Sequence, residues 1–128
     1  MNAVSFDRKV PLVIVPVTMK KGNEIVRYDF AIDTGATVSL IDVNLLKWMG
    51  FKEEDSIRTI QTITASKSET AYEFQIENIM ALGLIRRNFK VISRSLPVGL
   101  GIDGLLGLNF FKNKELTIDF KLSEIRIQ

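Results

Sequence analysis

Residues 30–42 read FAIDTGATVSLID, and the rest of the chain is best understood outward from this stretch. Asp33 stands between two runs of apolar and small residues that have the character of buried strands. A carboxylate in such surroundings is costly unless it is paired, hydrogen-bonded or protonated. Gly35 permits a tight turn after Thr34, so that main-chain N–H groups can be directed at the carboxylate. The stretch predicts a strand, a loop that presents Asp33 and a second strand, although a carboxylate in a simple turn at a strand end shows the same local pattern.

Composition limits the chemistry open to the chain. Its 128 residues include no histidine and no cysteine, and 17 basic against 15 acidic residues leave a net charge of +2. Disulfides, thiolate metal sites and triads with an imidazole base are therefore excluded. The small, scattered positive charge argues against nucleic-acid binding. We expect one domain over residues 1–128, without a metal or another cofactor.

The most apolar segment near the N-terminus, residues 10–19, has no small-residue cleavage site and contains Pro11 and Pro16. It is better read as a strand than as the core of a signal peptide. No apolar run approaches the roughly 18 residues that a membrane helix needs. We therefore expect no membrane association and a cytoplasmic location.

Short β-branched runs separated by turn residues predict an all-β domain with one or two short helices. The Lys-Gly-Asn turn at residues 21–23 predicts a hairpin. Asp42 is expected to cap a helix over residues 43–49, with Trp48 and Met49 facing the core. Strands are expected at residues 10–19, 24–32, 38–41, 56–64, 68–76, 79–82, 84–93, 115–120 and 124–128.

Residues 99–104 read GLGIDG and match the letter pattern of a dinucleotide-binding loop. That motif needs a strand directly before it and a long helix directly after it. Pro97 interrupts the approach, and the alternation of strands and helices is absent. The glycines are therefore interpreted as turn and close-packing positions.

A second segment, residues 105–111, reads LLGLNFF. The D-T-G-A at residues 33–36 and this downstream L-L-G together resemble the retropepsin-like aspartic proteases, single-domain relatives of pepsin in which the downstream glycine opens a short helix. The resemblance extends from about residue 10 to residue 127. It implies an acid-protease barrel with a flap hairpin, and an aspartic endopeptidase that hydrolyses a peptide or protein substrate.

The reaction needs one carboxylate that accepts a proton from water and one carboxylic acid that protonates the amide oxygen. Because the chain has a single D-T-G, the resemblance implies a homodimer in which Asp33 of each chain joins a proton-sharing dyad. Asp103 precedes a glycine without an intervening hydroxyl residue, so we do not expect it to be the second acid. The residues carried over as catalytic are Asp33, Thr34 and Gly35. Those expected to contact substrate are Ala36, Thr37, Ile63, Thr64, Ala65, Ser66, Leu105 and Leu106.

Residues 56–76 correspond in position to the family's flap, with a small polar tip at residues 65–67. This tip lacks the glycines of the retroviral members. Thr37 and Leu108 also stand where those members carry an interacting acid and arginine, so the retroviral dimer is not carried over unchanged. The alternative hypothesis, from another functional class, is a retropepsin-like module that binds a peptide or dimerises without catalysis.

Overall fold

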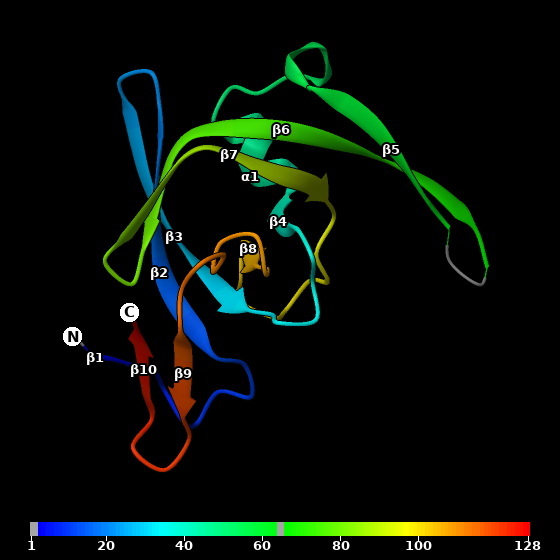
Figure 1. Cartoon of the computed structure of the whole chain (residues 1–128). Coiled ribbons are helices and arrows are strands. Elements are labelled where there is room, and N and C mark those ends of the chain that lie inside the picture. The colour runs from blue at the N-terminus through cyan, green and yellow to red at the C-terminus, as the bar shows by residue number, and fades with distance from the viewer. Residues whose placement is uncertain (1–2, 64–65) are drawn as a thin grey trace.

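The computed structural model describes residues 3–63 and 66–128, and its strands form two sheets (Figure 1). One has seven strands in the order β2-β3-β8-β4-β7-β6-β5, and the other has three in the order β1-β10-β9. The strands are β1 (Ala3–Ser5), β2 (Ile14–Lys21), β3 (Glu24–Ile32), β4 (Ser39–Asp42), β5 (Arg58–Ile63), β6 (Ser68–Ala81), β7 (Leu84–Arg94), β8 (Gly104–Leu106), β9 (Leu116–Asp119) and β10 (Glu124–Ile127). The helical elements are α1 (Val43–Trp48) and a single 3-10 turn, η1 (Glu53–Asp55).

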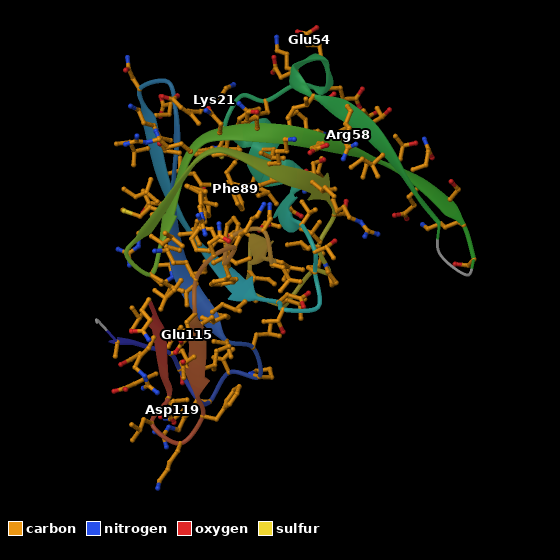
Figure 2. All side chains as sticks on the ribbon, viewed as in Figure 1. Lys21, Glu54, Arg58, Phe89, Glu115 and Asp119 are labelled. Atoms are coloured by element: carbon orange, nitrogen blue, oxygen red, sulfur yellow. The ribbon has the colours of Figure 1, made fainter. Side chains whose placement is uncertain are left out.

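Six strands of the larger sheet close into a barrel because β6 also pairs with β2, with Thr18 opposite Met80. The inward side chains are almost entirely apolar, and Phe30 and Phe110 are the largest that are fully buried. Phe89 extends from β7 into the same interior (Figure 2) and meets Phe110 edge to face. Burial of this apolar surface is the main stabilising contribution. The fold is the expected barrel, and residues 3–63 and 66–128 are all β apart from one short helix and one 3-10 turn.

Two-residue turns connect β2 to β3 and β6 to β7. The predicted hairpin around residues 21–23 is confirmed, since Lys21 pairs with Glu24 and leaves a two-residue turn. Gly22 opens that turn at φ 59°, which suits the right-handed twist of the flanking strands. Leu82 and Gly83 connect β6 to β7, both with positive φ, as the corresponding two-residue turn requires.

The chain ends meet in the three-stranded sheet (Figure 1). β1, which the sequence did not lead us to expect, pairs with β10 so that Val4 lies opposite Ile125. β10 continues to β9, as the two predicted C-terminal strands require. Ile125 is buried, and Phe6 packs edge to face on Phe120. Both terminal strands are therefore paired within one chain.

Several boundaries differ from the prediction. β2 begins only at Ile14, and the segments predicted at 68–76 and 79–82 form one continuous strand, β6. β8 was not predicted, and the expected short helix after Gly107 is a series of turns. A three-residue strand carries too little periodic signal to identify by itself.

The predicted cap of α1 is confirmed, because the Asp42 carboxylate accepts the Asn44 N–H at 3.0 Å. The prediction that Trp48 faces the core is wrong. Its side chain is 67% exposed and packs edge to face against Tyr28, whereas Met49 is buried as predicted. Leu45, Leu46 and Met49 together form the inward face of this short helix, and Trp48 projects to one side of that face, beside Tyr28. No helix within residues 3–63 and 66–128 is long and apolar enough to cross a membrane.

Candidate active site

The loop that follows β3 presents Asp33. The Asp33 N–H donates to the Leu106 carbonyl at 2.9 Å, which ties the start of the loop to β8. The loop then turns tightly, because the Ala36 N–H donates back to the Asp33 carbonyl at 3.1 Å. The Gly35 N–H donates to Asp33 Oδ1 at 2.9 Å and so orients the carboxylate. Asp33 is half-buried, so its carboxylate is held in place and is still reachable from solvent.

Gly107 supports this loop from below. A Cβ at this position would lie 2.6 Å from the Ala36 carbonyl oxygen and 2.9 Å from the Val38 carbonyl carbon. Both are backbone atoms that cannot rotate away, so only glycine fits. The next residue, Leu108, donates its N–H to the Ala36 carbonyl at 2.8 Å. The D-T-G-A loop and the downstream L-L-G are thus in direct contact, as their pairing in the sequence suggested.

A buried polar network below the loop was missed by the sequence reasoning. Ser39 is fully buried, and its Oγ accepts the Gly107 N–H at 2.9 Å and donates to Asn109 Oδ1 at 2.8 Å. Asn109 also accepts the Ser39 N–H at 2.9 Å and donates from Nδ2 to the Lys90 carbonyl at 2.9 Å. One sequence signal could have revealed it: Ser39 stands two positions before Ile41 in the same strand, so both side chains face the core. A buried polar group in that position must find a partner.

A half-buried apolar row lies beside the Asp33 loop, on the outer side of the sheet. Leu105 of β8 pairs with Leu40 of β4, which pairs with Ile92 of β7. Side chains directly opposite each other on neighbouring strands share one face of a sheet. The neighbouring Leu106 points to the other face and is fully buried in the barrel core. Of the two leucines expected to contact substrate, Leu105 is therefore the one that reaches the surface.

The other predicted substrate contacts are distributed over two regions. Ala36 is half-buried, and Thr34 and Thr37 are exposed on the loop that carries Asp33. Ser66 is exposed in the connection between β5 and β6. Ile63 ends β5, and its side chain, together with Thr64 and Ala65, lies outside the described residues.

Asp103 lies at the far end of the β3–β8 pair from Asp33. The Asp103 N–H donates to the Asp29 carbonyl at 2.8 Å, and Asp103 Oδ2 accepts the Asp29 N–H at 3.4 Å. Asp29 precedes Asp33 by four residues of extended chain, a separation of about 13 Å. The Asp33 and Asp103 carboxylates of one chain are therefore too far apart to share a proton. Among the described residues, no group of three or more acidic side chains is arranged to hold a metal ion.

Comparisons with known proteins identify the family and the fold of the chain. A profile of the family described as aspartyl protease matches residues 15–110, more than half of the chain. The structure is similar to that of a retropepsin-like aspartic protease from Rickettsia conorii, with a TM-score of 0.74 and 19% identity over 98% of this chain and 89% of that one. It is also similar to the retroviral protease-like domain of Ddi1 from Leishmania major, with a TM-score of 0.59 and 19% identity over 93% of this chain and 90% of that one. The search of curated protein sequences found no significant match. The chain belongs to the aspartyl protease family and has the retropepsin-like fold.

Proposed function

We propose that the protein is an aspartic endopeptidase that acts as a homodimer, with Asp33 of each chain contributing one carboxyl group to the active site. The observation that carries this proposal is the Asp33 loop, in which a reachable carboxylate is oriented by the Gly35 N–H at 2.9 Å. Preorganised hydrogen bonds of this kind hold a catalytic group in its working geometry. A purely structural carboxylate in a turn would not need the close support that Gly107 gives to the loop.

The chemistry requires two such groups. One Asp33 carboxylate removes a proton from a water molecule, and the oxygen of that water attacks the peptide carbonyl carbon. The protonated Asp33 of the partner subunit donates its proton to the carbonyl oxygen. In the collapse of the tetrahedral intermediate, the carbon–nitrogen bond breaks and the leaving amine takes the proton that the first Asp33 removed from water. Asp33 of the partner subunit, now ionised, takes a proton from a hydroxyl of the intermediate, which restores the starting state of the dyad. Two carboxyl groups within about 3 Å share one proton because both cannot ionise at that distance.

The surroundings of Asp33 favour an apolar substrate side chain. Leu105, Leu40 and Ile92 form a half-buried row that begins beside the loop. Replacement of Leu105 by Ala should raise the KM for peptides with a large apolar residue at the cleavage site and leave small-residue peptides little changed. The β5–β6 hairpin projects from the barrel and would cover a substrate lying on this row (Figure 1).

The first experiment measures cleavage of a diverse peptide pool between pH 3 and pH 8 by the wild type, Asp33→Asn and Asp103→Asn. The pH range is about that over which carboxyl dyads change their protonation. We expect cleavage by the wild type and by Asp103→Asn, and none by Asp33→Asn. Peptide binding without cleavage by any of the three proteins would favour a non-catalytic binding module instead.

The second experiment tests whether the active site is shared. Wild type and Asp33→Asn are mixed in equal amounts at constant total protein and allowed to exchange subunits. A shared dyad leaves about a quarter of the dimers with two Asp33 carboxyl groups, and so about a quarter of the activity. A monomeric enzyme would retain about half, and that result would contradict the homodimer.

A further inference from the structure

The strands β6 and β7 separate at one end of the barrel, beyond the last pair between them. They run side by side from Ala81 opposite Leu84 to Tyr72 opposite Ser93. β6 then continues alone with β5 as far as Ser68, along the arm that projects in Figure 1. A cavity of about 430 Å³ lies in the fork between the two strands.

On the edge of β6 that faces this cavity, the main chain of Thr70 has no strand partner within the described part of the chain. The Ile57 N–H donates to the Glu73 carbonyl at 2.7 Å, so the main chain of Glu73 points toward β5. These groups alternate in direction along a strand, so the N–H and C=O of Thr70 point away from β5. Among the described residues, no strand pairs with that edge between Ser68 and Ala71. Such an edge can accept an additional strand.

The two sides of the fork differ in chemistry. On the core side, the cavity shares Val43 and Tyr72 with an adjoining pocket of about 260 Å³. The buried side chains of Leu46 and Phe74 line that pocket, and Lys47, Lys52 and Glu53 also border it. On the outer side, the Arg94 guanidinium lies at the rim, 3.6 Å from the Glu69 carboxylate.

Arg94 is available to a further anion. Its side chain is 37% exposed, and its contact with Glu69 is longer than the 2.8 Å ion pair between Lys67 and Glu69. Asp42, its neighbour in register on β4, has its carboxylate oxygens engaged by the N–H groups of Asn44 and Leu96, each at 3.0 Å. A peptide carboxylate at the rim would therefore meet a cation that the nearby carboxylates do not fully neutralise.

We propose that the open edge of β6 binds an extended peptide segment as an additional strand. Side chains of such a segment alternate between the two sides of the sheet. An apolar side chain would occupy the pocket against α1, and the next residue would place a carboxylate at Arg94. The cavity reaches Val43 at the far end of β4 from the Asp33 loop, about 13 Å along the strand. The site is therefore separate from the cleavage site, and it does not depend on whether the chain is a protease.

The test uses a blocked pentapeptide, acetyl-Thr-Leu-Glu-Thr-Thr-amide, with the Asp33→Asn protein so that no cleavage occurs. Binding is followed by amide chemical-shift changes in 15N NMR titrations. We expect shifts at Thr70, Ser93 and Val43, and about tenfold weaker binding when Ser replaces the peptide's Leu. Exchange of the peptide's Glu for Lys should also weaken binding several-fold. Shifts confined to the Asp33 loop, or no binding at millimolar peptide, would overturn the proposal.

Backbone pairing is tested from both sides of the interface. N-methylation of the peptide at each position in turn should weaken binding about fivefold at alternate positions only, because every second N–H faces β6. Thr70→Pro removes the N–H at the open edge without touching the β5 ladder, and Thr70→Val is its matched control. Weakening by Pro but not by Val supports strand addition. Equal affinity of both variants, or an N-methyl series without alternation, refutes it.

Discussion

The buried hydroxyl of Ser39 gives the sharpest test of how the fold supports the Asp33 loop. Ser39→Ala removes the acceptor of the Gly107 N–H, and an orphaned buried donor costs about 1–3 kcal/mol. It also removes one of the two bonds that Ser39 donates to Asn109 Oδ1, worth about 1 kcal/mol. The expected loss in the free energy of unfolding is about 2–4 kcal/mol, against a total of about 5–15 kcal/mol for a domain of this class.

The assay is urea denaturation at one fixed protein concentration, with circular dichroism as the signal. Ser5→Ala, an exposed serine on β1, is the matched control and should change stability by less than about 0.5 kcal/mol. A double-mutant cycle with Asn109→Ala isolates the coupling between the two side chains, which should exceed about 0.5 kcal/mol. If Ser39→Ala costs no more than Ser5→Ala, the network does not support the loop and the reasoning fails.

Three further changes probe other parts of the molecule. Gly107→Ala should lower the free energy of unfolding by about 2–3 kcal/mol, measured by the same urea assay, because its Cβ would overlap backbone atoms of the Asp33 loop. Arg58→Ala should destabilise by more than Glu73→Gln in that assay, because it leaves the buried Glu73 carboxylate without its ion-pair partner; equal losses would contradict this. Lys67→Gln should raise the pKa of Glu69 toward its ordinary value, measured by carboxyl 13C NMR, because the Lys67 hydrogen bond is the main cause of its lowering. Since the folded pKa is lowered, the contribution of Glu69 to stability is present above its unfolded pKa and is lost as pH falls through the folded value.

Five of the six strands of the barrel could be predicted because their signals are local, and β8 was the exception. The turn at residues 21–23, the apolar runs and the Asp42 cap all act within a few residues, and the structure agrees with them. The predicted strand boundaries were wrong where pairing with a distant segment decides where a strand begins or ends. β6 runs unbroken from Ser68 to Ala81 because its two halves have different partners, β5 and then β2, on the same edge. The sequence pattern of β6 does not show that two different strands pair with successive parts of this edge.

The sequence by itself determined which loop carries the candidate chemistry, because Asp33-Thr34-Gly35 and the downstream leucines and glycine are unusual in combination. It also determined the β class, since strand periodicity is a local property. Only the tertiary structure decided that Leu105 reaches the surface while Leu106 is buried, because a strand of three residues does not reveal which face meets the core. Only the folded chain brings Ser39 to Asn109, 70 positions apart, and opens the fork between β6 and β7. These features depend on pairings between distant segments, and such pairings exist only once the barrel has closed.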